Sequence, residues 1–326
     1  MTGVGAEGVA KIREARVLIV GCGALGTHLA DTLTRAGVGA LDVVDRDVVE
    51  WSNLQRQVLF DEADARAGLP KAVAAQRRLE SINGEVSVTA YVAECSRRFL
   101  EELPHRPDVV LDGTDNFPTR YLLNDWCHRA GLPWIYAGAV GAEGASMVLR
   151  PDGPCLRCLW PEPPAQADVG SCETRGVLGP AIAAVTAFQA TEALKLLVGA
   201  EATTGVFTCD VWRSNYQVLP LASGPAPDCP CCGRGEHPAL QSSAVAAVTL
   251  CGRDAVQLQP PDAEGHDLDA LADRLAGVVE DLQRTPHLLR FAVDGARITV
   301  FPGGRALFFG VTDELRARAL YDRWLR

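Results

Sequence analysis

Apolar runs and helical periodicities alternate along the first half of the chain. Residues 16–20 form an apolar run that stops at a cluster of glycines, and Leu25, Leu29 and Leu33 then recur at every fourth position of 24–36. This pattern predicts a strand, a loop and a helix. Further strands are predicted at 41–45, 86–92, 108–112 and 133–137, and further helices at 70–82 and 118–130. Strands that alternate with helices predict an α/β fold with a doubly wound, mainly parallel sheet.

The pattern changes twice further along the chain. Residues 151–179 form a loop rich in Pro, Cys and Gly, which is more typical of a functional segment than of a simple connection. A long helix at 180–198, a hairpin at 204–211 and 214–220, and a linker at 222–228 follow it. The tail then predicts a small α+β appendage, with a strand at 254–259, a helix at 268–283, apolar runs at 288–293, 297–301 and 305–310, and a closing helix at 312–325. We therefore expect two domains, 1–236 and 240–326.

Composition and charge narrow the class of protein. The 326 residues include 41 acidic and 31 basic side chains, for a net charge of −10, and 48% of them are hydrophobic. A chain this apolar can bury one or two ordinary cores. Its acidic balance disfavours nucleic acids and anionic membranes as partners, because both need a cationic surface to meet phosphates.

Neither an export signal nor a membrane span is expected. Residues 1–18 lack the apolar core of a signal peptide. The longest uncharged stretch, 176–191, contains a proline and a glutamine and is too short and too polar to cross a bilayer. The expected location is therefore the cytoplasm, where the 11 cysteines stay reduced. Metal binding or thiol chemistry becomes the leading explanation for so many of them.

Two C-x-x-C pairs, about 70 residues apart, favour a metal site. Cys155 and Cys158 lie in the long loop, and Cys229 and Cys232 follow the hairpin. Four thiolates in two such pairs are typical of a closed, structural zinc site, the alternative being two redox or unliganded pairs. Cys231 is a surplus thiol of the second pair, and the six histidines are scattered with no pairing at metal-ligand spacing.

A glycine-rich loop indicates a nucleotide. Gly21, Gly23 and Gly26 match G-x-G-x-x-G between a predicted strand and a predicted helix, which is the fingerprint of a Rossmann-like nucleotide site. The glycines let backbone N–H groups and the helix N-terminus approach a phosphate. Asp45, at the end of the second strand, is placed to hydrogen-bond a ribose. The motif alone does not choose between NAD and ATP.

The polar residues that follow favour ATP. Asn53 and Arg56 lie just past Asp45, Lys71 opens the next helix, and Asp115 follows a later strand. In an open α/β sheet, ligands bind at that edge. Cations that face a triphosphate, with an aspartate for magnesium, suit phosphoryl or nucleotidyl transfer. A dehydrogenase would need a proton-transfer group opposite a nicotinamide, and no histidine is placed for that.

Cys172 stands apart from the metal pairs, in the loop before the long helix 180–198. Arg175 and the start of that helix would lower the pKa of its thiol. A thiol in such a loop can reach a substrate, so we expect Cys172 to be reactive, the alternative being an incidental exposed cysteine.

Together these segments resemble the ThiF/MoeB/HesA family of ubiquitin-activating-enzyme-like adenylyltransferases. The family's blocks are matched, in its order, by GCGALG, DRDVVEWSNLQRQ, LPKAVAA, DGTDNFPTRYLLND, PCLRC, GVLGP with QATEALKLL, and CPCCG. The resemblance covers about residues 7–235. The tail is similar to the extension on some longer ThiF-type members.

The resemblance implies a reaction and its partners. ATP-dependent adenylation of the C-terminal Gly-Gly carboxylate of a ubiquitin-like sulfur carrier (ThiS- or MoaD-like) would give acyl-adenylate and pyrophosphate. A homodimer is implied, with 1–236 as the ATP-binding, zinc-containing domain and a cysteine desulfurase or rhodanese-type protein as sulfur donor. The implied ATP-binding residues are Gly21, Gly23, Gly26, Asp45, Asn53, Arg56, Lys71 and, through magnesium, Asp115. Cys172 would attack the carrier's acyl-adenylate, or accept the sulfur of the carrier in a mixed disulfide.

Alternatives remain at this stage. The same fold could activate a ubiquitin-like modifier for conjugation to proteins, or could bind a carrier without turnover, and an NAD-dependent dehydrogenase is the rival from another class. The family commonly carries an arginine segment ahead of the first strand, and Arg13 and Arg16 do not match its context. Without that arginine, one cation fewer would face the phosphates of ATP, so we expect weaker ATP turnover than in family members that carry the segment.

Overall fold

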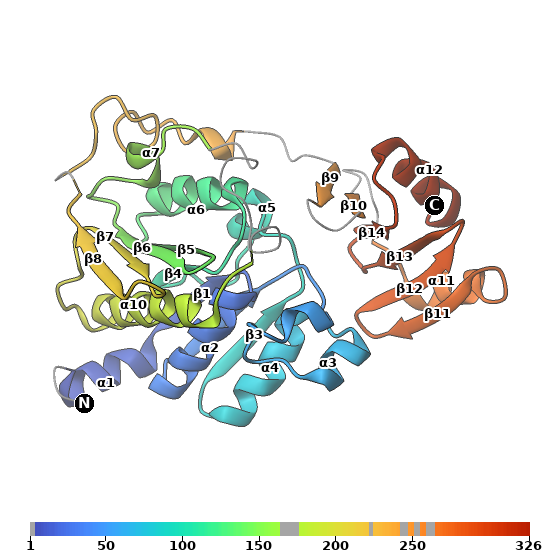
Figure 1. Cartoon of the computed structure of the whole chain (residues 1–326), viewed down its shortest axis with the longest axis horizontal. Helices are drawn as coiled ribbons and strands as arrows, with labels where there is room; N and C mark the ends of the chain where they lie inside the picture. The colour runs from blue at the N-terminus through green and yellow to red at the C-terminus, as the bar shows by residue number, and fades with distance from the viewer. Residues whose placement is uncertain (1–3, 164–175, 222–223, 242–246, 251–254, 259–264) are drawn as a thin grey trace. The chain divides into compact units, whose positions relative to one another are not determined.

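The computed structural model describes the chain except residues 1–3, 164–175, 222–223, 242–246, 251–254 and 259–264 (Figure 1). The chain divides into two compact units, Met1–Ser242 and Ser243–Arg326. Each unit has its own sheet.

The first unit is built on an eight-stranded sheet. Its strands are β1 (Arg16–Val20), β2 (Ala40–Val44), β3 (Ser87–Tyr91), β4 (Val109–Asp112), β5 (Trp134–Val140), β6 (Glu143–Leu149), β7 (Val206–Asp210) and β8 (Asn215–Leu219). The spatial order is β3-β2-β1-β4-β5-β6-β7-β8. The strands from β3 to β5 pair in parallel, and β6, β7 and β8 extend the sheet in antiparallel fashion. The expected mainly parallel, Rossmann-like sheet is confirmed.

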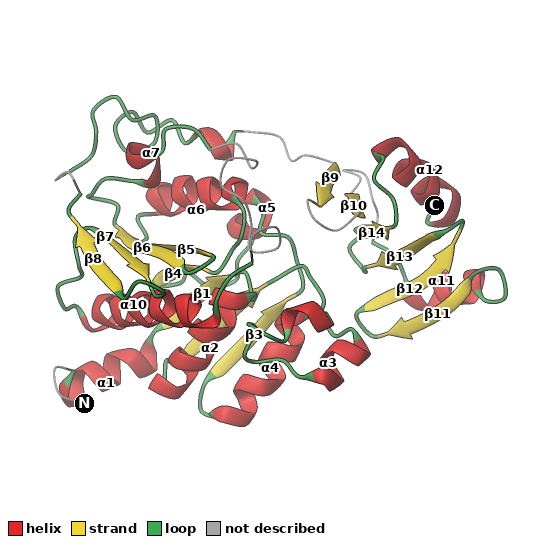
Figure 2. Ribbon diagram, viewed as in Figure 1, coloured by secondary structure: helices red, strands yellow, loops and turns green. Residues whose placement is uncertain are grey.

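Helices cover both faces of this sheet (Figure 2). The described helices are α1 (Gly5–Glu14), α2 (Ala24–Ala36), α3 (Glu62–Ala67), α4 (Lys71–Ile82), α5 (Arg97–Glu101), α6 (Phe117–Ala130), α7 (Leu156–Leu159) and α10 (Gly179–Val198), with short 3₁₀ turns η1 (Trp51–Asn53) and η2 (Pro238–Leu240). In Figure 2, α6 lies on one side of the strands and α2 and α10 lie on the other.

The alternation of side chains along β1 explains why both faces are covered. Val17 and Ile19 pack into the core shared with α2, α4 and α10, whereas Leu18 and Val20 pack into the core shared with α5 and α6. All four side chains are buried. Because successive residues of a strand point to opposite faces, a continuous apolar run requires a layer of helix on each side.

Several elements were not predicted from the sequence. Helices α1, α3 and α5 are short and polar on one face, which leaves too little apolar periodicity to find them. Strand β6 is rich in Gly, Ala and Ser, and it forms a hairpin with β5 through Gly141, whose φ is +62°. Positive φ is a conformation that glycine adopts at low cost, so this turn follows from that residue.

Helix α10 contains the apolar stretch that the sequence did not predict to cross a membrane. It runs over 20 residues and is long and apolar enough to cross one by length and composition alone. The helix nevertheless packs against β5, β6 and α2. Its buried Gln189 donates to the carbonyl oxygens of Asp112 and Ile135 at 3.0 and 2.9 Å. These contacts make α10 a core helix of the first unit.

The second unit holds a six-stranded antiparallel sheet with two helices. The elements are β9 (Ala247–Leu250), β10 (Ala255–Leu258), α11 (Leu268–Leu275), β11 (Glu280–Thr285), β12 (Leu288–Val293), β13 (Ala296–Val300), β14 (Ala306–Phe309) and α12 (Glu314–Trp324). The strand order is β11-β12-β13-β14-β10-β9. The α+β appendage is thus confirmed. The helix predicted over 268–283 is wrong beyond Leu275, because Gly277 turns the chain with a φ of +75° and β11 follows.

Candidate functional site

The loops after β1, β2 and β4 meet at one edge of the first sheet. Strand β1 pairs in parallel with β2 on one side and with β4 on the other. The chain therefore reverses its winding direction at β1, and the carboxyl ends of β1 and β4 flank a topological switch point. Ligands of open α/β sheets bind at such points.

Close packing explains two of the three glycines in the loop after β1. A Cβ on Gly26 would lie 1.9 Å from the carbonyl oxygen of Gly21, and a Cβ on Gly21 would lie 2.7 Å from Gly113. A Cβ on Gly23, in contrast, would have a single neighbour within 4 Å, Gln57 Nε2 at 3.9 Å. Packing within the described chain thus gives no steric reason for Gly23, and the space where its Cβ would lie is open.

Asp45 links the loops after β1 and β2. Its Oδ2 accepts a hydrogen bond from the Cys22 N–H at 2.7 Å, and its Oδ1 accepts one from the Asp47 N–H at 2.7 Å. Burial raises the pKa of Asp45, and the nearby Lys71 ammonium acts in the opposite direction. The carboxylate is thereby fixed beside the glycine loop, and its role as a ribose ligand stays a prediction.

Lys71 is a buried cation at the first position of α4. It is 4% exposed, and its Nζ lies 3.5 Å from Asp47 Oδ2. Its backbone N–H donates to the carbonyl oxygen of Asp47 at 2.9 Å. Lysines are rarely buried unless they are paired, so this contact holds an ammonium group at the edge of the sheet.

The segment that contains Asn53 and Arg56 packs onto this edge. Asn53 is 1% exposed, and its Oδ1 accepts a hydrogen bond from the Glu50 N–H at 3.1 Å. Arg56 Nη1 donates to the carbonyl oxygen of Ser52 at 2.9 Å and its side chain is partly exposed. Gln57 is 3% exposed, and its Oε1 has no hydrogen-bond partner among the described residues. An acceptor in this position costs free energy unless a ligand or water satisfies it.

Asp115 lies in the loop between β4 and α6 and is exposed. A buried ion pair joins the two ends of this loop: Arg120 Nε of α6 donates to Asp112 Oδ2 at the end of β4 at 2.9 Å. Arg120 Nη2 also donates to the carbonyl oxygens of Thr114 and Ala137. These bonds fix the backbone on both sides of the carboxylate while leaving Asp115 open to a ligand.

The four expected cysteines come together in space. The Cys155 and Cys229 Sγ atoms are 3.5 Å apart, those of Cys158 and Cys232 are 3.3 Å apart, and all four lie within 4.8 Å of one another. Tetrahedral zinc with Zn–S bonds of about 2.3 Å holds its sulfurs about 3.8 Å apart. A hydrogen bond from the Cys231 thiol lowers the pKa of Cys155, whereas burial raises the pKa of Cys229 and Cys232. The donor set therefore fits zinc.

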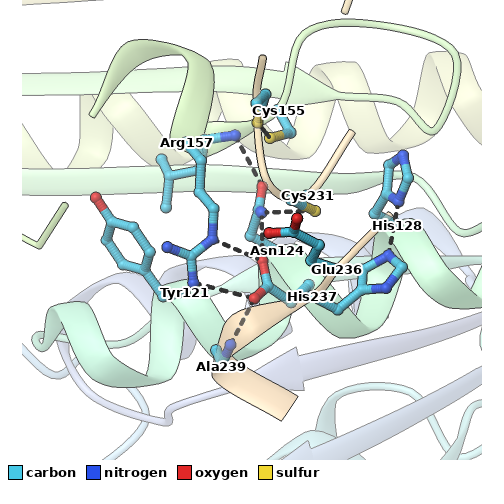
Figure 3. A network of polar contacts seen from close by, with 12 residues as sticks. Tyr121, Asn124, His128, Cys155, Arg157, Cys231, Glu236, His237 and Ala239 are labelled. Atoms are coloured by element: carbon cyan, nitrogen blue, oxygen red, sulfur yellow. Dashed lines mark hydrogen bonds and ion pairs between the residues drawn. The ribbon is translucent and has the colours of Figure 1, made fainter. Parts of the chain in front are cut away.

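Two adjacent residues in the middle of α6 contact the segments that carry both cysteine pairs, and Figure 3 labels the first of them, Asn124. Asn124 Oδ1 accepts from the Leu156 N–H at 2.8 Å, and Asn124 Nδ2 donates to Cys231 Sγ at 3.4 Å. The neighbouring Asp125 accepts two hydrogen bonds from Arg157 at 3.0 Å and one from the Ala239 N–H at 2.7 Å. Helix α6 thus joins the segment between Cys155 and Cys158 to Cys231 and to the segment that follows the second cysteine pair.

A profile of the ThiF family matches residues 1–231. The chain belongs to the ThiF family. The sulfur carrier protein ThiS adenylyltransferase of Bacillus subtilis (strain 168) is 39% identical over 324 residues, which cover 99% of this chain and 96% of that protein. The enzyme with the same description in Escherichia coli (strain K12) is 41% identical over 229 residues, covering 70% of this chain and 89% of that one.

Two further matches bear on this ThiF-family chain. The SAMP-activating enzyme E1 of Haloferax volcanii is 44% identical over 237 residues, covering 72% of this chain and 86% of that protein. The crystal structure of E. coli MccB with ATP has a TM-score of 0.60 at 24% identity, covering 70% of this chain and 68% of that one. This second match supports the fold alone.

Sequence reasoning missed several residues of this ThiF-family site. Gly113 packs against Gly21, and Gln57 borders Gly23, yet neither belongs to the G-x-G-x-x-G pattern. The histidines show no metal-ligand spacing along the sequence, yet two of them meet in space: His128 Nδ1 lies 3.0 Å from His237 Nε2. They are 109 residues apart in the chain, so no local spacing could indicate the contact. Cys172, with Arg175, lies outside the described residues.

Proposed function

We propose that the protein adenylates the C-terminal Gly-Gly carboxylate of a ubiquitin-like sulfur carrier at the edge formed by the loops after β1, β2 and β4. The observation that carries this is the convergence of an open glycine, a fixed carboxylate and a buried cation, represented by Gly23, Asp45 and Lys71. Family membership and the relatives named as sulfur carrier adenylyltransferases support it.

The residues have separable roles in this proposal. The glycine loop and the N-terminus of α2 bind phosphate through backbone N–H groups, and Asp45 accepts hydrogen bonds from the ribose. Lys71, Asn53 and Arg56 contact the phosphates, and the two cations neutralise the charge that develops on them. A carboxylate oxygen of the carrier attacks the α-phosphate and pyrophosphate leaves. The attacking carboxylate is already ionised at pH 7, so the site needs no general base.

Magnesium and zinc are assigned to different places. Asp115, exposed at the edge of the sheet, would bind Mg²⁺, which neutralises phosphate charge when it is present. Zinc at Cys155, Cys158, Cys229 and Cys232 would stabilise the fold and take no part in the chemistry, because four thiolates leave no open position.

Carrier-dependent ATP–pyrophosphate exchange tests the function. Exchange is expected only with a carrier that ends in Gly-Gly, and a carrier lacking those two residues is the matched control. Asp115→Ala should abolish most of the exchange, whereas Asp108→Ala, at the opposite end of β4, should leave the chemistry intact. Equal binding of NADH and ATP, or exchange unaffected by Asp115→Ala, would contradict the assignment. A protein that binds the carrier without exchange would be a non-catalytic relative.

Sulfur transfer is assigned to Cys172 on sequence grounds. We propose that its thiolate attacks the carbonyl carbon of the acyl-adenylate, forming a thioester and releasing AMP. In the alternative, the Cys172 thiolate takes the outer sulfur of a persulfide on a cysteine desulfurase or rhodanese-type donor, and the donor's thiolate leaves. The outer sulfur of the resulting Cys172 persulfide then attacks the acyl-adenylate, so that AMP leaves and a disulfide links Cys172 to the carrier. Cys172→Ser should preserve exchange and abolish a reducible or thioester-linked adduct with the carrier. Loss of exchange as well would mean that Cys172 belongs to the nucleotide site.

A second candidate is activation of a ubiquitin-like modifier. It is favoured by the similarity to the SAMP-activating enzyme of Haloferax volcanii. Covalent conjugates on other proteins, detected by mass spectrometry, would support it over sulfur transfer. For either function we propose a homodimer in the cytoplasm, which sedimentation and cell fractionation test.

A further inference from the structure

Beside the four cysteines, three other metal-binding side chains come together. His128 lies near the end of α6, and Cys231 and His237 follow the hairpin β7–β8. The His128 Nδ1 and His237 Nε2 atoms are 3.0 Å apart, and one nitrogen of each ring lies within 4.8 Å of Cys231 Sγ. Figure 3 shows the two imidazole rings facing each other next to the Cys231 thiol. None of the three belongs to the set Cys155, Cys158, Cys229 and Cys232.

The chain holds these side chains from several directions. Cys231 is fully buried, and Asn124 Nδ2 donates a hydrogen bond to its sulfur at 3.4 Å. An N–H donor of this kind orients a thiolate ligand and stabilises its charge. The Glu236 N–H donates to the carbonyl oxygen of Pro230 at 2.7 Å, and the Ala239 N–H is held by Asp125. The backbone before His237 is therefore fixed to the second cysteine pair, and the backbone after it is fixed to α6.

The backbone at His237 has an unusual conformation. Its φ is +49°, in the left-handed region that a non-glycine residue adopts at a cost of about 1–3 kcal/mol. The conformation places the ring against His128, where the two rings lie 5.2 Å apart between centroids. Both histidines are half-buried, so a metal bound between them would be reached from solvent on one side.

The distances suit a transition metal. Two Zn–N bonds of about 2.0–2.1 Å at a tetrahedral angle hold the nitrogens about 3.4 Å apart, which is within about half an ångström of the observed separation. Two imidazoles and a thiolate are ligands that zinc prefers. Three protein ligands leave a fourth position open, unlike the four-cysteine cluster.

We propose that His128, Cys231 and His237 form a second zinc site, separate from the four-cysteine site, with its fourth position open to water or to an exogenous ligand. Bound zinc would link the segment after the second cysteine pair to α6, whose first turn follows Asp115. This proposal does not depend on adenylation. It also gives a role to Cys231, which lies close to Cys155 and would otherwise be an alternative ligand of the four-cysteine site.

Counting zinc in the full-length protein tests the proposal directly. Protein free of any histidine tag is saturated with Zn²⁺, passed through a desalting column and analysed by mass spectrometry for metal per chain. The wild type is expected to retain two zinc ions, and His128→Ala/His237→Ala to retain one. His105→Ala, which removes an exposed histidine elsewhere, is the matched control and should retain two. One zinc in the wild type, or two in the double variant, would overturn the proposal.

Two further measurements separate the second site from misfolding and from a shared site. Cys231→Ser should also retain one zinc, and retention of none would assign Cys231 to the four-cysteine site and overturn the proposal. Titration of metal-free wild type with Co²⁺ should show two sets of absorption bands, one for four thiolates and one for a single thiolate with two imidazoles. A spectrum of four-thiolate bands alone would equally overturn it, and this result needs no variant to fold.

Discussion

At the scale of single residues, the three glycines after β1 serve different purposes. Gly26 and Gly21 allow the loop to pack on itself and on Gly113, since a Cβ on either would overlap backbone atoms. Gly23 has open space in front of it. The first two are therefore needed for the packing of the fold, whereas Gly23 is assigned to ligand binding in the function proposed above.

Two substitutions separate these roles. Gly23→Ala should leave thermal stability within about 1 kcal/mol of the wild type, since it loses only the modest advantage of glycine over alanine as an N-cap. It should weaken ATP binding at least tenfold, because the methyl group occupies the position of a phosphate. Gly26→Ala, the matched comparison, should lower the melting temperature strongly. Calorimetric titration with ATP and thermal unfolding measure both effects, and unchanged ATP affinity in Gly23→Ala would place the nucleotide elsewhere.

Lys71 carries a second prediction at this scale. Lys71→Ala should reduce ATP–pyrophosphate exchange roughly 30- to 900-fold, which corresponds to about 2–4 kcal/mol for one preorganised charge. Lys11→Ala, which removes an exposed lysine paired with Glu7, should have no effect. The variant should also shift the acid limb of the exchange profile to higher pH. Lys71 lowers the pKa of Asp45, so without it the carboxylate is protonated at a higher pH.

The sequence predicted these residues unevenly, for a physical reason. Glycine and Asp45 positions follow from a local pattern, because a strand, a tight loop and a helix are contiguous in the chain. Gln57 and the His128–His237 contact depend on tertiary packing between distant segments, which local spacing does not encode. Cys155, Cys158, Cys229 and Cys232 could be predicted because C-x-x-C pairing is itself a local signal.

At the scale of elements, α6 connects the two functional parts of the first unit. Its first turn follows Asp115, and Arg120 anchors the end of β4 through Asp112. Four and five residues later, Asn124 and Asp125 contact the segments that carry both cysteine pairs. The same helix thus positions the edge of the sheet and the four-cysteine cluster. A disturbance of the cluster is expected to reach the nucleotide site through α6.

Asp125→Ala tests this connection. Removing the carboxylate leaves the buried Arg157 without its ion pair, which should cost about 3–5 kcal/mol of unfolding free energy. Zinc should also be lost at a lower chelator concentration, since Asp125 orients the segments that carry the ligands. Glu102→Ala breaks the exposed pair with Arg98 and serves as control, with no measurable change expected. Chemical denaturation and a chelator titration measure both quantities, and wild-type values for Asp125→Ala would contradict the role assigned to α6.

Elements also differed in how well the sequence predicted them. Strands β1, β2 and β4 and helices α2 and α6 are long apolar runs or clear periodicities bounded by glycine, and they were predicted to within one or two residues. The helix expected over 268–283 contains Gly277, and the alternation after it belongs to β11. The apolar spacing over 268–283 continues across Gly277 and predicts one helix, whereas the backbone forms α11 before this glycine and β11 after it.

At the scale of the whole molecule, the two units have separate hydrophobic cores. The core of the second unit contains Phe291 and Phe308 from its sheet and Leu271 and Leu320 from its two helices. The cores of the first unit draw on strands and helices from Ile12 to Leu240. Each core is built from residues of its own unit. A substitution in the core of one unit is therefore expected to change the unfolding free energy of that unit.

Phe291→Ala makes this expectation quantitative. The side chain is fully buried between β12 and the helices of the second unit, so its removal should destabilise that unit by about 3–5 kcal/mol. Hydrogen-exchange mass spectrometry should then show faster exchange in peptides from 265–326, with β1, α2 and α6 unchanged. Leu315→Ala removes an exposed leucine of α12 and is the control, with hydrogen exchange expected to match the wild type.

Since every residue assigned to nucleotide binding lies in the first unit, ATP–pyrophosphate exchange should persist in Phe291→Ala. The opposite result would be a loss of ATP–pyrophosphate exchange while hydrogen exchange in the first unit stays at the wild-type rate. That result would show that the second unit contributes to catalysis, most directly by binding the carrier.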